Sequence, residues 1–203
     1  MSDIKRVILF GGQGSSSLFS SQGALAATND VKSSVAAAIL LSKCHAAFLE
    51  EVQGLGIARS EVFGDECDFF NSPEKLLAPD ATYHDNPIIQ GTTICLYQLL
   101  RYLANVRGSE LEFKSAFQKI LETAGFCSGI LPAAVVASSR TVQEYVDFGV
   151  EAFRLAFWTG YRSTLYCQKI LGRRWKELPW SLVVMGLNED QMLAKVEDFH
   201  NQV

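Results

Sequence analysis

The chain has 203 residues, of which 48% are hydrophobic and 20% are charged, enough to bury one good core. The net charge is −4 and the basic residues are scattered, so electrostatics give no reason to expect nucleic acid or an anionic membrane as a partner. No apolar run has the length of a signal peptide or a membrane span, and we expect a cytoplasmic globular protein.

The cysteines argue against a fold held by disulfides or metal. Their number is five, which is odd, and no two are spaced as a CxxC pair. Neither a disulfide framework nor a zinc site is indicated, so free thiols and no metal are expected.

In chain order, the first predicted elements are a buried strand and a helix. Residues 6–10 form a β-branched and aromatic run that glycines end, typical of a strand leading into a loop. Asn29 and Asp30 are good caps for an alanine- and leucine-rich helix that reaches about Val52. Prolines and acidic residues then predict irregular structure over 57–87, with a short helical turn in "SPEKLL".

The second half of the chain has mostly helical periodicity. A helix with one buried face is predicted after Pro87, and one long helix or two over 141–171. Residues 113–121 also have helical spacing, although a short strand "ILETA" competes for the end of that segment. From Ser181 on, the pattern predicts a strand, a turn and a helix that starts with a capping box at Asn188.

The segment "GFCSG" has the form of a nucleophile elbow, a strained turn that displays a nucleophile between a strand and a helix. Gly125 and Gly129 would be required there because side chains would collide with the neighbouring elements. Cys127 is the candidate nucleophile, and the N-terminus of the following helix would favour its thiolate. The alternative is that Cys127 is a packed thiol in an ordinary helix, as free cysteines usually are.

The glycine-rich loop "FGGQGS" lacks both the Lys-Ser/Thr pair of a P-loop and the third glycine of a dinucleotide fingerprint. Phosphate binding is therefore not expected. Such a loop can instead offer a backbone N–H as one half of an oxyanion hole, and a flexible turn is the alternative.

Several motifs carry a resemblance to a known family. "FGGQGS", "NPIIQGTTICLYQLLRYL", "GFCSG" and "AFRLAFWTGYRS" occur in the order and approximate spacing seen in the acyltransferases of fatty acid and polyketide synthesis. The cysteine in place of the usual serine, followed by "ILPAAVVASS", looks most like the starter unit:acyl carrier protein transacylase domain of fungal non-reducing polyketide synthases. The resemblance implies an α/β fold, with a parallel-sheet acyltransferase core and nucleophile elbow over 1–181 and the start of a small ferredoxin-like α+β subdomain over 182–203.

The resemblance also implies a chemistry. Cys127 would take a starter acyl group from an acyl-CoA or an acyl carrier protein as a thioester, and would pass it to the phosphopantetheine thiol of an acyl carrier protein to initiate polyketide synthesis. The backbone N–H groups of Ser128 and Gln13 would form the oxyanion hole. No cofactor would be bound beyond these acyl carriers, and the partners would be the carrier protein and adjacent synthase domains.

The same resemblance bears on the substrate. Malonyl-selective relatives clamp the substrate carboxylate with an arginine where this chain has Thr159, in "RLAFWTG". Without that bidentate donor, an uncharged acyl group is implied for the acyl pocket around Thr159. Ile130 in place of a polar residue agrees with this, as would Phe157 and Trp158 if they face the pocket; core packing is the alternative for these two aromatics.

The family's catalytic histidine lies well downstream of the elbow, and His45, His84 and His200 match none of its positions. We therefore expect the general base beyond residue 203. A cysteine-dependent thioesterase or hydrolase, and a catalytically silent domain that docks a carrier protein, are the alternative functions.

Overall fold

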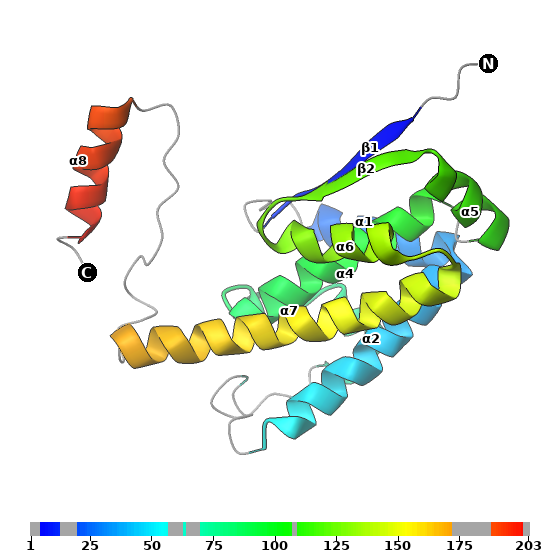
Figure 1. Ribbon diagram of the computed structural model, residues 1–203. Helices are drawn as coiled ribbons and strands as arrows, with labels where there is room; N and C mark the ends of the chain where they lie inside the picture. The colour runs from blue at the N-terminus through cyan, green and yellow to red at the C-terminus, as the bar shows by residue number, and fades with distance from the viewer. Residues whose placement is uncertain are drawn as a thin grey trace. The chain divides into compact units, whose positions relative to one another are not determined.

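The computed structural model describes residues 5–12, 20–56, 63, 70–106, 109–171 and 188–200. The chain divides into two compact units, residues 1–161 and 162–203, while the predicted boundary after residue 181 stays a prediction. The elements, labelled in Figure 1, are β1 (Arg6–Phe10), α1 (Ser21–Ser33), α2 (Val35–Gly54), η3 (Pro73–Leu76), η4 (Ala81–Tyr83), α4 (Pro87–Asn105), α5 (Glu110–Gln118), β2 (Ile120–Gly125), η5 (Cys127–Gly129), α6 (Ile130–Ser138), α7 (Val142–Leu171) and α8 (Glu189–His200).

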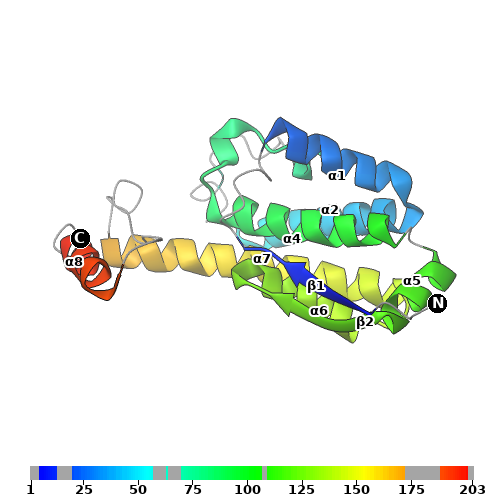
Figure 2. The same ribbon diagram turned by 90° about the horizontal axis from the view of Figure 1, so that it is seen from above.

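The described strands form one parallel pair. Val7 is in register with Glu122 and Phe10 with Gly125, after an irregularity between Arg6 and Val7. Parallel strands need a long crossover connection, which here runs through α1, α2, α4 and α5. In Figure 1 the strands lie at the top of the first unit, and Figure 2 shows α6 running alongside them. The α/β class is confirmed, with a sheet of two strands in the described part of the chain.

The predicted start of a helix at Asn29 and Asp30 is wrong, because these residues lie inside α1. The break falls at Ser34, whose backbone is extended (φ −146°, ψ 123°) and whose hydroxyl accepts a hydrogen bond from the Ala37 N–H at 3.3 Å. Asp30 is buried instead and pairs with Arg101 of α4 at 3.0 Å. Asn and Asp are residue types that often begin a helix. Here the Asp30 carboxylate pairs with Arg101 of α4 and does not cap a helix.

Other helical predictions are confirmed. α4 begins at Pro87, where the Asn86 side chain accepts a hydrogen bond from the Ile88 N–H at 2.9 Å. The segment over 141–171 forms one helix, and "SPEKLL" contains the turn η3. None of the helices in the described ranges is both long enough and apolar enough to cross a membrane.

The helical spacing over 113–121 predicts too long a helix. α5 ends at Gln118, and Ile120 already belongs to β2, where it pairs with Arg6 of β1. Hydrogen bonds to a strand distant in sequence thus outweigh the local period, and the competing prediction of a strand in "ILETA" is confirmed.

Aromatic side chains join the helices of the first unit. The Phe48 ring of α2 lies 4.9 Å from the Phe70 ring and 5.8 Å from the Phe157 ring of α7, between centroids. Tyr102 of α4 stacks on Tyr145 of α7 at 5.3 Å. Each such pair stabilises the fold by about 1 kcal/mol beyond the free energy gained by burying its surface. These contacts therefore fix how α2, α4 and α7 pack.

The pair between Asp30 and Arg101 gives the stability a predictable pH dependence. Burial raises the pKa of Asp30 above its ordinary value, and the charge of Arg101 partly lowers it again. A carboxyl group whose pKa is higher in the folded than in the unfolded protein destabilises the fold once the pH rises above the pKa of the unfolded protein. Arg101→Met removes the favourable charge, so we expect the free energy of unfolding to fall by about 1 kcal/mol near pH 7 and much less near pH 3.5.

Urea unfolding at the two pH values measures this difference. Lys114→Met is the matched control, because Lys114 pairs with the exposed Glu110 at 3.1 Å. An equal loss at both pH values in the Arg101→Met variant would show that the loss comes from packing and not from charge.

In the second unit, α8 begins with the predicted capping box. The Asn188 side chain accepts a hydrogen bond from the Gln191 N–H at 3.0 Å, and the Asn188 N–H donates to the Gln191 side chain at 3.1 Å. The capping box is therefore confirmed. The strand predicted from Ser181 lies outside the described residues, and the ferredoxin-like subdomain stays a prediction.

Candidate functional site

Cys127 lies on a tight turn between β2 and α6. β2 ends at Gly125, Phe126 is still extended (φ −103°, ψ 130°), and η5 leads into α6 at Ile130. Cys127 has a φ of 54°, and it alone among the described non-glycine residues has a positive φ. Such a conformation costs about 1–3 kcal/mol and persists only where the surrounding structure enforces it. Because the residue is also exposed, Cys127 is not a packed thiol inside an ordinary helix.

The glycines on either side of Cys127 have no room for a side chain. A Cβ at Gly125 would lie 2.2 Å from the carbonyl oxygen of Gly129, and a Cβ at Gly129 would lie 2.4 Å from the carbonyl oxygen of Phe10. Both obstacles are backbone atoms, which cannot move aside without disturbing the turn or β1. The sharp turn that displays Cys127 therefore depends on glycine at both positions.

The glycine-rich loop starts directly against Cys127. The Phe126 N–H donates to the carbonyl oxygen of Phe10 at 2.9 Å, which ties the end of β1 to the turn. A Cβ at Gly12 would lie only 2.7 Å from the Cβ of Cys127. The structure thus brings together two motifs that are far apart in sequence. Gln13 itself lies outside the described residues, directly after Gly12 in the chain.

Ser128 follows Cys127 in the turn and is partly buried. Its Oγ is shielded from solvent and has no hydrogen-bond partner among the described residues. The described part of the chain therefore leaves this hydroxyl at the turn without a hydrogen bond.

Cys127 differs from the other described thiols of the first unit. Cys44 and Cys95 are fully buried. Burial raises the pKa of Cys95 to about 12 and that of Cys44 well above its ordinary value, so both thiols stay protonated at neutral pH. Cys67 lies outside the described residues, and Cys167 belongs to the second unit. Among the described thiols of the first unit, Cys127 alone is exposed, and it lies on the turn.

The described histidine rings contact backbone carbonyls. His45 is buried, with its Nε2 2.8 Å from the carbonyl oxygen of Phe70, and the Nε2 of His84 lies 3.3 Å from that of Pro79. The side chain of His200 lies outside the described part. Within that part, no group of three or more His, Cys, Asp or Glu side chains could hold a metal ion.

The aromatic pair of "RLAFWTG" packs in or against the core of the first unit. Phe157 is fully buried against Phe48 of α2, and the Trp158 Nε1–H donates to Glu51 of α2 at 2.9 Å. Arg154 pairs with Glu51 as well. Core packing, the alternative left open by the sequence, is therefore confirmed for both aromatics.

Thr159 lies where α7 passes the start of α4. It is exposed, and its hydroxyl donates to the Leu155 carbonyl of its own helix at 2.7 Å. The next residue, Gly160, packs so closely that a Cβ there would lie 2.7 Å from the Cα of Ile88. Thr159 thus presents a short side chain without charge beside this helix crossing.

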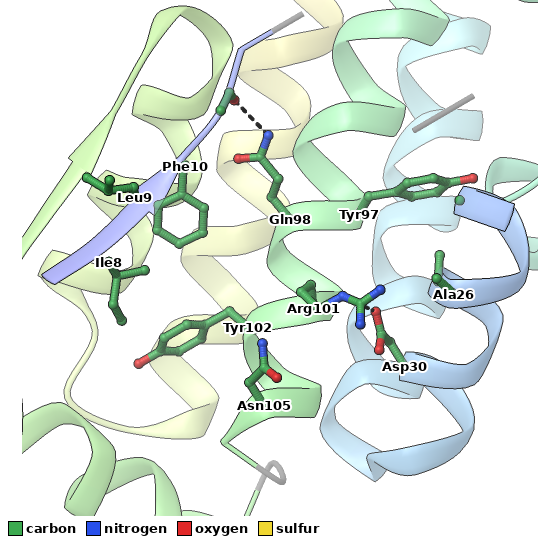
Figure 3. Close-up of a pocket in the computed structure, with 13 residues that line it drawn as sticks. Ile8, Leu9, Phe10, Ala26, Asp30, Tyr97, Gln98, Arg101, Tyr102 and Asn105 are labelled. Carbon is green, nitrogen blue, oxygen red and sulfur yellow. Dashed lines mark hydrogen bonds and ion pairs between the residues drawn. The ribbon is translucent and has the colours of Figure 1, made fainter. Parts of the chain in front are cut away.

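A cavity of about 340 Å³ lies between β1, α1 and α4 (Figure 3). Its walls are mostly apolar, with Ile8 and Phe10 on the β1 side. The Tyr102 hydroxyl at its edge is buried and has no hydrogen-bond partner among the described residues. Burial raises the pKa of Tyr102 to about 12, so this hydroxyl stays protonated at neutral pH.

Gln98 connects this cavity to the glycine-rich loop. Figure 3 shows its side chain reaching from α4 to the end of β1, where its Nε2 donates to the carbonyl oxygen of Gly11 at 2.8 Å. Gln98 was not predicted from the sequence to be a site residue. Its signal in the sequence is weak, a carboxamide on α4 with Arg101 one turn later on the same side of the helix.

The chain is similar in sequence to proteins of known type. A family model described as "Starter unit:ACP transacylase in aflatoxin biosynthesis" matches residues 8–203. An orsellinic acid synthase of Armillaria mellea is 35% identical over 206 residues, covering 96% of this chain and 9% of that protein. An orsellinic acid synthase of Beauveria bassiana is 32% identical over 190 residues, covering 89% of this chain and 8% of that protein. A non-reducing polyketide synthase of Byssochlamys spectabilis is 28% identical over 158 residues, covering 77% of this chain and 7% of that protein. The chain therefore spans less than a tenth of the length of these relatives.

Proposed function

Because the chain belongs to the starter unit:ACP transacylase family, we propose that it loads a starter acyl group onto an acyl carrier protein through a thioester on Cys127. One observation carries the proposal: an exposed cysteine held at positive φ between a strand and a helix. This is the position of the nucleophile in an elbow, where the side chain projects from the turn toward an incoming substrate. The sheet and helices of the first unit then serve as the acyltransferase core.

The proposed reaction exchanges one thioester for another. The Cys127 Sγ attacks the carbonyl carbon of the donor thioester, a new C–S bond forms, and the donor thiol, CoA or a carrier-protein phosphopantetheine, leaves. The acceptor phosphopantetheine thiol then attacks the enzyme thioester and releases the Cys127 thiol. The bonds formed and broken are of the same kind, so the acyl-enzyme is not a deep energy minimum.

Each attack places negative charge on the carbonyl oxygen, which needs hydrogen-bond donors. We assign the backbone N–H groups of Ser128 and Gln13 to this oxyanion hole. The close packing of Gly12 on Cys127 supports the assignment, because Gln13 is the next residue of the loop. We expect the general base beyond residue 203, because His45, His84 and His200 match none of the positions of the family's catalytic histidine.

We infer that the acyl group carries no carboxylate. Thr159 offers no charge at the position where malonyl-selective relatives of the superfamily have an arginine. Arg154, one turn earlier, is paired with Glu50 and Glu51, so its guanidinium is not free to bind a substrate carboxylate. Ile130, directly after the turn, is 61% exposed and offers an apolar contact instead.

The relatives are named as orsellinic acid and non-reducing polyketide synthases. We infer that the chain acts within such a synthase, with an acyl carrier protein and the adjacent synthase domains as its partners, and we propose a cytoplasmic location for it.

To test the proposal, a polypeptide that contains this chain is incubated with an acyl-CoA. Mass spectrometry then shows whether an acyl group is bound and on which peptide. We expect one acyl adduct on the peptide containing Cys127, and loss of at least about 99% of it in Cys127→Ala, since no other group there can form the thioester. Acetyl-CoA and hexanoyl-CoA should give the adduct faster than malonyl-CoA. Cys167→Ala is the control and should keep the adduct.

The fate of the acyl group separates the candidate functions. Transfer to an added carrier protein supports the transacylase, whereas release of free acid into water would identify a thioesterase. The absence of any adduct on Cys127 would overturn the proposal and favour a silent docking domain.

A further inference from the structure

We propose that Gln98 is a positioning residue that holds the start of the glycine-rich loop in place for acyl transfer, an inference that rests on the proposed function. Gln98 lies on α4, 87 residues away in sequence from the Gly11 carbonyl that it binds. It does not touch the reacting atoms. It acts through the backbone of Gly11 and Gly12.

The carbonyl oxygen of Gly11 lies at the meeting point of three elements. It is at the end of β1, it accepts the hydrogen bond from Gln98 of α4 at 2.8 Å, and a Cβ at Gly129 of the turn would lie 2.5 Å from it. The carbonyl therefore faces the turn and α4 together. A change in its direction would have to displace one of these neighbours.

The direction of this carbonyl determines where the next residues go. The peptide group between Gly11 and Gly12 is planar, so fixing its C=O also fixes its N–H and the Cα of Gly12. Glycine has no Cβ to restrict its backbone, and two glycines in sequence need an outside contact to select one conformation. Gln98 supplies that contact, and Gly12 then packs on Cys127.

The orientation of the Gln98 carboxamide follows from its partner. A carbonyl oxygen can only accept, so the nitrogen of the carboxamide must face Gly11 and the oxygen must face away. That oxygen, Oε1, is buried and has no hydrogen-bond partner among the described residues. Among the described residues, the side chain therefore has one hydrogen bond, the one that its nitrogen donates to the loop.

Gln98→Met keeps the length of the side chain and removes the donor, and Gln98→Glu keeps its shape but presents carboxylate oxygen to the carbonyl. We expect acylation of Cys127 by hexanoyl-CoA to slow about tenfold in Gln98→Met, and further in Gln98→Glu, because a misplaced loop stabilises the oxyanion less well. The second measurement is alkylation of Cys127 by iodoacetamide, which forms no oxyanion. Its rate should stay within about twofold of wild type in both variants.

Gln90→Met is the matched control. Gln90 is on the same helix, is partly buried like Gln98, and donates its side-chain nitrogen to the carbonyl of His84 at 2.5 Å. We expect both rates to be unchanged in this variant.

The outcomes separate this inference from the proposed function. If wild-type protein forms the Cys127 adduct and Gln98→Met forms it equally fast, the positioning role is wrong while the transacylase stands. If alkylation slows as much as acylation, Gln98 merely supports the fold, and the inference is again overturned. If wild-type protein forms no adduct, the proposed function itself has failed.

Discussion

Replacing Gly129 with alanine is expected to abolish acylation of Cys127 and to lower the free energy of unfolding by about 3 kcal/mol. The new Cβ would lie 2.4 Å from the carbonyl oxygen of Phe10 and 2.5 Å from that of Gly11, both backbone atoms. To relieve the clash, either β1 or the turn must move, and Cys127 would leave its place beside Gly12. Urea unfolding measures the loss of stability, and mass spectrometry measures the acyl adduct.

Gly54→Ala is the control for this prediction. Gly54 is the last residue of α2, and a Cβ there would meet nothing within 4 Å. Alanine is the better helix former, so the variant should match or exceed wild-type stability by up to about 1 kcal/mol. If Gly129→Ala instead behaves like Gly54→Ala in both measurements, the turn is not as closely packed as the structure shows.

The second large effect is expected from Phe157→Ala. This side chain is fully buried among Phe48, Phe63 and Trp158, and its removal leaves a cavity where α7 packs on α2. The free energy of unfolding should fall by about 3–5 kcal/mol. Because Phe157 packs in the core against α2, we expect the ratio of acylation rates with acetyl-CoA and hexanoyl-CoA to stay the same.

Phe148→Ala provides the comparison, because Phe148 lies on the same helix and is 42% exposed. Its removal should cost less than about 1.5 kcal/mol, since much of the ring is already in water. A changed preference for acyl-chain length in Phe157→Ala, at a temperature where the variant is folded, would mean that this residue does shape the substrate site.

Local sequence patterns predicted a helix correctly where the residues that start it keep that local role in the folded protein. Asn86 and Pro87 begin α4 because the Asn86 side chain and the proline satisfy the helix start by themselves, and Asn188 begins α8 in the same way. The prediction was wrong where a distant partner competes. Asp30 pairs with Arg101 of α4 and so does not cap a helix, and β1 draws Ile120 into a strand.

For the candidate site, the sequence alone singled out Cys127 and its two glycines, because a nucleophile on a tight turn needs small neighbours within two residues of it. It also determined the family, since several motifs keep their order along the chain. Only the tertiary structure decided that Gly12 packs on Cys127, that Phe157 and Trp158 face α2, and that Gln98 reaches the loop. These contacts join residues far apart in sequence, and no local spacing encodes them, because they follow from how β1, α2, α4 and α7 pack.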